Sequence, residues 1–224
     1  MKFLKNNFTW FEVIAIIVSG YYLFFPKPYK VAFILVMSIP IIGLFINRLK
    51  GRQSILTLFR VNNDYSLTIF FKFPAIAILI RVILEFELEN SFNLISPSIT
   101  AFCLVMMVIA VTHKIEVPSD INYLSIYLPL VFFVAVYSTA VTFGINCAFD
   151  TSNPSIYNSK ITDKRIYSNK GKSYNIVLES WKDGIEDKKI SISSEEYNSI
   201  EIGEKANVIV YEGFLNIPWF YVDL

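Results

Sequence analysis

The sequence has 224 residues, of which 54% are hydrophobic, 16% aromatic and only 17% charged. A soluble domain has about 45–50% apolar residues even when Gly is counted, so the composition indicates a protein that lies largely in lipid. With 20 Lys and Arg against 19 Asp and Glu, the net charge is too small for a nucleic-acid-binding protein.

The charge is divided unevenly along the chain. Residues 1–149 hold 11 Lys and Arg against 7 Asp and Glu, whereas residues 150–224 hold 9 against 12. A basic, apolar part joined to a mildly acidic, polar part is a common membrane-protein pattern. We therefore predict two domains, a transmembrane helical domain over residues 1–149 and a soluble domain over residues 150–224.

Five segments of the first domain are apolar enough to cross a bilayer as helices, which takes ~20 residues each. In chain order they cover residues 8–25, 29–47, 66–86, 94–113 and 122–146. The fold class is therefore a membrane helical bundle of about five spans, with the lipid bilayer as its main partner.

The first span resembles a signal peptide in position only. Thr9 and Glu12 have the spacing of a capping box that opens a helix, and Pro26 ends the helix. Because Glu12 interrupts the apolar run and no small-residue cleavage site follows, we expect this span to be retained.

Lys and Arg in the loops predict the orientation of the spans. With the N-terminus in the cytoplasm, two basic residues, Lys27 and Lys30, lie outside, and seven lie inside. The seven are Lys2, Lys5, Arg48, Lys50, Arg52, Arg60 and Lys114. This bias predicts a cytoplasmic N-terminus, and five spans then place the C-terminal domain outside the cytoplasm. One span more or fewer would move that domain to the other side.

Two readings stay open for the inner segment over residues 48–64. It contains an apolar stretch flanked by basic residues, as in a helix that lies on the inner leaflet, but an ordinary loop fits equally well. The two cysteines are expected to remain reduced, because a mid-helix Cys103 is badly placed to meet Cys147 at a helix end. We expect Cys103 to be a buried small hydrophobe.

The hydrophobic period changes after Asp150. Residues 174–179 and 189–193 alternate between apolar and polar side chains, and residues 207–211 form a continuous apolar strand. Turn signals at Asp183-Gly184 and Glu212-Gly213 separate these runs. Together with one helical turn at Ser194–Tyr197, the pattern predicts about five short strands in a small all-β, barrel-like domain.

The stretch from Ile190 to Gly213 joins a strand, a helical turn, an acidic corner at Gly203-Glu204 and an apolar strand. This order resembles the small C-terminal β domains of uncharacterised bacterial multi-pass membrane proteins, and the resemblance covers roughly residues 186–222. It implies a bacterial inner-membrane setting and a small-barrel tail, and it carries over no catalytic residue.

Three ionisable residues lie within the predicted spans, where a charge is costly. Glu12 is in the first turn of span one and suits helix capping. Lys72 lies two turns into span three, where a pair with Glu12 would tie the two helices together. Arg81 lies nearer the outer end of span three, where it can reach water or pair with Glu85 at i,i+4. Pro40, Pro74 and Pro129 lie inside spans and are expected to be structural.

No catalytic motif is recognisable, so no enzyme activity, cofactor or metal site is expected. Glu85, Glu87 and Glu89 form an acidic outer loop that could gather a cation, but a solvated loop accounts for them better. His113, the one histidine of the chain, suits an interfacial position at the inner end of span four.

These features favour a non-enzymatic integral membrane protein whose exported β domain, residues 150–224, binds a protein partner or senses its surroundings. An accessory subunit, a sensor or an immunity-type protein would fit. A small transporter or channel subunit is the first alternative, and it predicts that Glu12, Lys72 and Arg81 face the bundle interior. A membrane enzyme is the second, and it predicts a polar pocket at the level of the helix ends.

Overall fold

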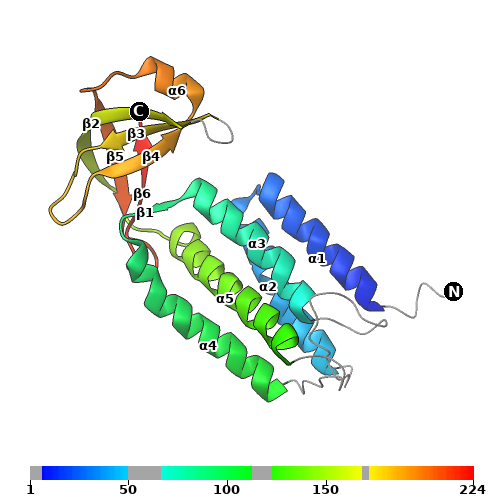
Figure 1. Cartoon of the computed structure of the whole chain (residues 1–224). Helices are drawn as coiled ribbons and strands as arrows, with labels where there is room; N and C mark the ends of the chain where they lie inside the picture. The colour runs from blue at the N-terminus through cyan, green and yellow to red at the C-terminus, as the bar shows by residue number, and fades with distance from the viewer. Residues whose placement is uncertain (1–6, 50–66, 113–122, 168–171) are drawn as a thin grey trace. The chain divides into compact units, whose positions relative to one another are not determined.

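The computed structural model describes residues 7–49, 67–112, 123–167 and 172–224 (Figure 1). The chain forms two compact units. A helical unit contains the chain up to Glu85 together with Ser91–Phe149, and a β unit contains Phe86–Asn90 together with Asp150–Leu224. The β unit therefore includes a short segment from within the helical region, which the sequence did not indicate.

Five helices of the described chain form the helical unit. They are α1 (Asn7–Phe24), α2 (Tyr29–Leu49), α3 (Leu67–Glu85), α4 (Ile95–Thr112) and α5 (Tyr123–Ala148). A short 3-10 helix, η2 (Ser91–Leu94), precedes α4. Each helix begins and ends within two residues of a predicted span, because long apolar runs bounded by polar residues leave little freedom for the helix ends.

Two helices of the described chain are long and apolar enough to cross a membrane, namely Ser91–Thr112 and Tyr127–Ala148. Phe11–Phe24 and Tyr29–Phe45 are shorter apolar helices. By length and composition, these two helices are the candidates for membrane spans among the described residues, and a five-span bundle is not confirmed.

Within the helical unit, α3 packs against α1, α2 and α5, whereas α4 packs mainly against α5. As a result only Ser98 and Ile109 of α4 are buried, and its side chains at Met107 and Val111 are 62% and 79% exposed. The prediction that Cys103 is buried is wrong, because Cys103 lies on an exposed part of α4. Because α4 is apolar on its buried and its exposed side alike, hydrophobicity alone did not distinguish the two faces.

One glycine and one tyrosine hydroxyl of α5 contact α2 closely. Gly144 of α5 faces the ring of Phe33, so closely that a Cβ at this position would lie 2.5 Å from Phe33 Cε2. Pro40 removes a backbone donor from α2, and Tyr137 of α5 donates a hydrogen bond of 2.5 Å to the carbonyl of Met37 one turn earlier. The kink-prone region of α2 is thus stabilised by α5.

The β unit is one antiparallel sheet in the form of a half-barrel. Its strands are β1 (Glu87–Leu88), β2 (Ser155–Tyr167), β3 (Ser173–Leu178), β4 (Lys188–Ile192), β5 (Lys205–Tyr211) and β6 (Trp219–Asp223). The strand order is β1-β6-β5-β2-β3-β4. Because β5 returns beside β2 after the β2-β3-β4 meander, these four strands form a Greek key. The prediction of a small all-β unit at the C-terminus is confirmed at this level.

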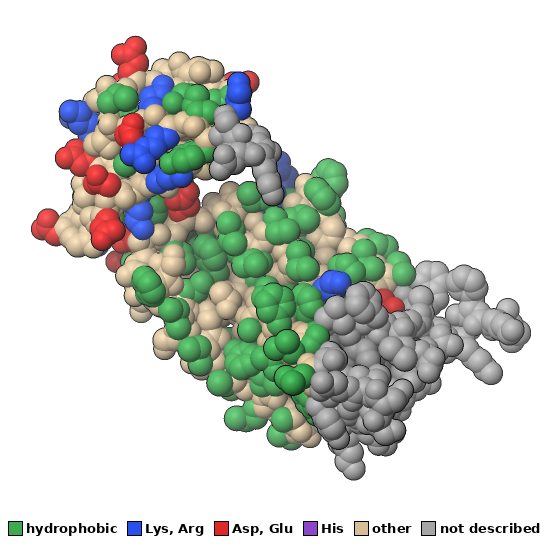
Figure 2. Space-filling view, viewed as in Figure 1, with side chains coloured by type: hydrophobic (Ala, Val, Ile, Leu, Met, Phe, Trp, Pro, Cys, Tyr) green, Lys and Arg blue, Asp and Glu red, His purple; other side chains and the backbone are tan. Residues whose placement is uncertain are grey.

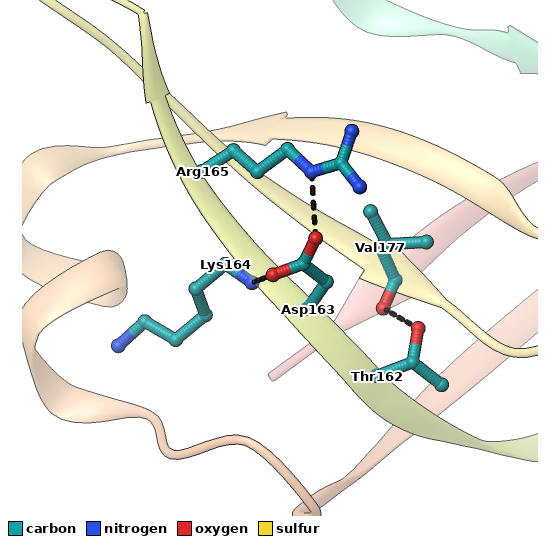
Figure 3. A network of polar contacts seen from close by, with 5 residues as sticks. All are labelled: Thr162, Asp163, Lys164, Arg165 and Val177. Atoms are coloured by element: carbon teal, nitrogen blue, oxygen red, sulfur yellow. Dashed lines mark hydrogen bonds and ion pairs between the residues drawn. The ribbon is translucent and has the colours of Figure 1, made fainter.

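A bulge bends the long strand β2. Its first half pairs with β5 and its second half with β3, and the register shifts between Ile161 and Asp163. In Figure 3 the hydroxyl of Thr162 points to the carbonyl of Val177, to which it donates at 3.2 Å. The Asp163 carboxylate accepts from the backbone of Lys164 at 2.8 Å and from Arg165 Nε at 2.6 Å. These local contacts replace the ladder bonds that the extra residue interrupts.

The core of the β unit consists of inward-facing apolar side chains of the strands and their connections. Its buried members are Ile161, Ile176, Leu178, Trp181, Ile190, Ile200, Ala206, Val208, Val210 and Phe220. In β5, which includes the predicted apolar strand over residues 207–211, the residues at alternate positions are buried, so this strand has one inner and one outer face. Helix α6 (Ser194–Ser199) begins with a capping box at Ser193 and Glu196, and Lys164 Nζ donates to the carbonyls of Tyr197 and Ile200 at its end.

Candidate interaction site

Two chain segments that enter the β unit from the helical unit meet at the start of β6. The first is Phe86–Asn90, which follows α3, and the second begins at Asp150, two residues after α5. In the first, Glu87 and Leu88 pair with Phe220 and Trp219 as strand β1. The backbone N–H of Glu89 also donates to the carbonyl of Pro218 at 3.0 Å. A connection between two helices is thus part of the C-terminal sheet.

Asp150 fixes the second segment. One carboxylate oxygen accepts from Trp219 Nε1 at 2.8 Å and from the Gly213 backbone at 2.9 Å. The other oxygen accepts from the Ser152 backbone at 2.8 Å. Burial tends to raise the pKa of Asp150, but these hydrogen bonds to the ionised form outweigh it and lower the pKa below its usual value. Asp150 is therefore ionised at neutral pH and joins the chain entry to β5 and β6.

The turn between β5 and β6, residues 212–218, lies between these two segments. Its first residue, Glu212, donates its backbone N–H to Ser152 Oγ at 3.1 Å, and its last residue, Pro218, accepts from Glu89. Gly213 and Asn216 have φ angles of 79° and 57°, in the left-handed region that Gly and Asn tolerate best. Phe214 and Leu215 at the tip are 59% and 37% exposed.

An aromatic stack covers the outer face of the sheet beside this turn. The rings of Tyr211 and Trp219 lie parallel, with centroids 4.5 Å apart and an interplanar angle of 8°. Phe86 meets Trp219 edge-on at 5.2 Å, and Tyr221 extends the stack beyond Tyr211 at 6.2 Å. The stack is rigid, since Trp219 is also held by Asp150.

The open side of the half-barrel, between β1 and β4, is bridged by side chains rather than by a backbone ladder. Lys188 Nζ, at the start of β4, donates to the carbonyl of Glu89 at 2.8 Å. Trp181 Nε1 donates to Glu89 Oε1 at 3.3 Å. Burial raises the pKa of Glu87 and the nearby Lys188 opposes that rise. Glu87 and Glu89 are thus parts of the sheet and of its seam, so the expectation of a solvated acidic loop is wrong for these two residues.

Beyond Lys188 the strand β4 is the edge of the sheet. Its side chains alternate, with Ile190 buried and with Lys189 and Ser191 exposed on the outer face. The outer face here differs from that near β6, because it carries the charged side chains of Arg165 and Lys189, and Lys189 Nζ lies 3.9 Å from the ring centroid of Tyr167. On the face seen in Figure 2, charged side chains gather on the β unit and hydrophobic ones cover the described helical unit.

Of the three candidates within the predicted spans, Arg81 has a defined set of partners. It forms an i,i+4 ion pair with Glu85 and donates to the carbonyl of Leu23 at 3.4 Å, which links α3 to the end of α1. Tyr22 and Tyr29 share a hydrogen bond of 2.8 Å nearby. A cavity of about 610 Å³ adjoins the cluster and is lined by Tyr21, Phe24, Phe25, Pro26, Lys27, Tyr29, Arg81 and Glu85. The contacts of Arg81 are those of a residue that joins helix ends.

The other two candidates are half-buried in their helices. Lys72 Nζ lies 5.9 Å from the ring centroid of Phe73, at the limit of a cation–π contact, and Glu12 lies in the first part of α1. The Glu12–Lys72 pair stays a prediction. Within the described ranges no group of three or more His, Cys, Asp or Glu side chains gathers where a metal ion could bind. His113 and the segment over residues 50–64 lie outside the described residues.

Sequence reasoning missed the contacts of the two segments that enter the β unit, Phe86–Asn90 and the segment that begins at Asp150, for two reasons. A two-residue strand such as β1 has no detectable period, and Asp150 is recognisable only as a domain boundary. The one available signal was the run of residues 213–222, which contains no charged residue although it lies in the polar part of the chain.

Comparisons with protein-family models, with curated proteins and with solved structures gave no match to this chain.

Proposed function

We propose that this protein is a multi-pass membrane protein of the bacterial inner membrane. Its helices hold a non-enzymatic interaction domain at the extracytoplasmic face of that membrane. In this proposal all five helices α1–α5 cross the bilayer, the N-terminus is cytoplasmic and the β unit is extracytoplasmic. The β unit acts as a sensor, an accessory module or an immunity-type module by binding a protein partner.

The observation that carries the proposal is the pairing of β1 with β6. The two strands belong to one sheet, yet they are separated in sequence by α4 and α5, which contain the two candidate membrane spans of the described residues. Two crossings return the chain to the side from which it started, so both strands reach the same side only if α4 and α5 both cross or neither does. Apolar side chains exposed along α4 support the first case, because water would disfavour such a surface.

The edge of β4 is the partner-binding surface that we propose. A partner in extended conformation would add a strand along Lys189–Ile192, with backbone hydrogen bonds giving affinity and Lys189 selecting for acidic segments. A photo-crosslinking amino acid at Ser191 should form a discrete adduct in intact cells. The same group at the exposed Glu195, at the start of α6, is the control, and equal adducts at both positions would contradict the proposal.

The topology is tested by labelling single cysteines with a membrane-impermeant thiol reagent. Cys147 is unsuitable because it is only 5% exposed, so Cys103 and Cys147 are both replaced by Ala. Asp183→Cys reports the β unit, Lys27→Cys the first outer loop, and Ser119→Cys the segment between α4 and α5. For cells with an outer membrane, that layer is permeabilised first.

Labelling at positions 27 and 183 with protection at 119 is the expected result. Protection at 27 and 183 with labelling at 119 would reverse the orientation and place the β unit in the cytoplasm. Equal labelling of 119 and 183 would show that α4 and α5 do not cross the bilayer, and the proposal would fail.

A further inference from the structure

We infer that the β5–β6 turn is a membrane-contacting element, which inserts Phe214 and Leu215 into the headgroup layer of the outer leaflet. This inference rests on the proposed function, since it requires α5 to cross the bilayer. It concerns a surface other than the β4 edge, and its ligand is the phospholipid interface rather than a protein.

The first step is the distance between the turn and the end of α5. The apolar stretch Tyr127–Ala148 has 22 residues, which at 1.5 Å per residue gives about 33 Å, close to the ~30 Å of the hydrocarbon core. Ala148 therefore lies near the boundary of that core. Two further residues reach about 7 Å at most, so Asp150 lies within the headgroup layer.

The second step is the attachment of the turn to Asp150. The Gly213 backbone lies 2.9 Å from the Asp150 carboxylate, and Phe214 is the next residue. On its other side the turn is bonded to Glu89, four residues after the end of α3. Both ends of the turn are thus fixed to segments that have just left, or are about to enter, a predicted span. These contacts keep the turn next to the first residues that follow α3 and α5.

The third step is the chemistry of the turn. Phe214 and Leu215 are exposed apolar side chains, no residue from 213 to 222 is charged, and the neighbouring rings of Tyr211 and Trp219 are amphipathic. Aromatic residues of this kind favour the membrane–water interface. Exposure alone would not single out the turn, because Ile202, between α6 and β5, is 61% exposed. Ile202 has no comparable hydrogen bond to Asp150 or to Glu89, so it serves as the matched control.

The test measures the depth of nitroxide labels on the full-length protein in vesicles of phosphatidylethanolamine and phosphatidylglycerol. Single-cysteine variants carry the label at Phe214→Cys, at Ile202→Cys or at the native Cys103 of α4, with the remaining native cysteines replaced by Ala. Collision with oxygen, which concentrates in lipid, is compared with collision with a water-soluble nickel complex. Leu215→Cys provides a second position in the turn if Phe214→Cys does not fold.

We expect the ratio of oxygen to nickel collisions to be several-fold higher at 214 than at 202, and highest at 103. A lipid-like ratio at 103 with equal, water-like ratios at 214, 215 and 202 would overturn the inference and leave the proposed function intact. A water-like ratio at 103 would overturn both, because α4 would then not lie in the bilayer.

Discussion

At the residue scale, single carboxylates decide how the β unit is joined to its entering segments. Asp150 accepts three hydrogen bonds in its ionised form, whereas Glu87 lies partly buried at the seam, with Lys188 nearby. Glu87 follows the end of α3 and Asp150 follows the end of α5, but their environments shift their pKa values in opposite directions. They are therefore expected to affect stability at different pH.

Replacing Asp150 by Asn removes the charge and replaces one of the two carboxylate oxygens by an NH2 group, which cannot accept the hydrogen bonds that Trp219, Gly213 and Ser152 donate. Hydrogen bonds to a charged group contribute about 1.5–3 kcal/mol, so we expect Asp150→Asn to lower the free energy of unfolding of the β unit by about 1–3 kcal/mol at neutral pH. Denaturant unfolding, followed by the fluorescence of Trp219 and Trp181, measures this change.

The pH dependence checks the cause of that change. Because the pKa of Asp150 is below its usual 3.8 in the folded state, its contribution is complete above pH 3.8 and is lost as the pH falls through the folded value. The difference between wild type and Asp150→Asn should therefore shrink at acid pH. A difference that stays constant with pH would mean that the charge of Asp150 does not matter.

Replacing Glu87 by Gln should change the free energy of unfolding of the β unit in the opposite direction to Asp150→Asn. Burial raises the folded pKa of Glu87 above 4.5, so its ionisation destabilises the folded state as the pH rises through that value. We expect Glu87→Gln to stabilise the β unit at neutral pH, by less than Asp150→Asn destabilises it, and to have no effect below pH 4.5. Loss of stability at pH 7 would show that the attraction of Lys188 outweighs burial.

At the element scale, α2 and α5 approach each other closely where Gly144 of α5 faces Phe33 of α2. Gly144→Ala would bring a Cβ to 2.5 Å from Phe33 Cε2, and overpacking of this kind costs about 1–3 kcal/mol. Gly20→Ala is the control, because no side chain or backbone atom lies within 4 Å of its added Cβ and Ala favours a helix by ~1 kcal/mol.

Thermal unfolding in detergent, followed by circular dichroism, compares these two variants. The midpoint should fall for Gly144→Ala and stay or rise for Gly20→Ala. Equal midpoints for Gly144→Ala and wild type would contradict the tight packing of Phe33 on α5.

The elements that the sequence predicted well are those with a period or a length to detect. The helix bounds followed from apolar length, β3 and β4 from alternation at residues 174–178 and 189–192, and α6 from the helical turn predicted at Ser194–Tyr197. Strand β2 was not identified, because the bulge at Thr162 breaks its alternation and Asp163, Lys164 and Arg165 resemble a loop.

The candidate site could be predicted only in part. The pairing of Arg81 with Glu85 follows from their spacing on one helix. The contacts of Glu87, Glu89 and Asp150 do not, since each joins residues that are far apart in sequence and no local pattern encodes the partner.

At the scale of the whole molecule, the β unit is not one continuous segment of chain. Residues 150–224 alone lack β1 and the contacts of Glu89 with Trp181 and Lys188. We expect this fragment to be less stable than a fusion in which a Gly linker after Leu224 leads into residues 86–90, because β1 runs antiparallel to β6 and can follow it as a hairpin.

The recovered hydrogen bonds should contribute about 2 kcal/mol in all, which in a domain of this size raises the melting temperature by roughly 8–16 °C. Calorimetry on the two fragments measures the difference. A fusion with residues 86–90 in scrambled order is the control, and an equal gain from both fusions would mean that the register of β1 is unimportant.

The pairing of β1 with β6 also has a consequence for biogenesis. During synthesis β1 leaves the ribosome before α4 and α5, and its partner follows only after both. If the two helices cross the bilayer as proposed, a molecule in which one of them fails to insert has β1 and β6 in different compartments. Such a molecule cannot complete its sheet, and its unpaired strands and exposed core mark it for proteolysis. In the proposed topology, completion of the sheet would therefore distinguish correctly inserted chains from the others.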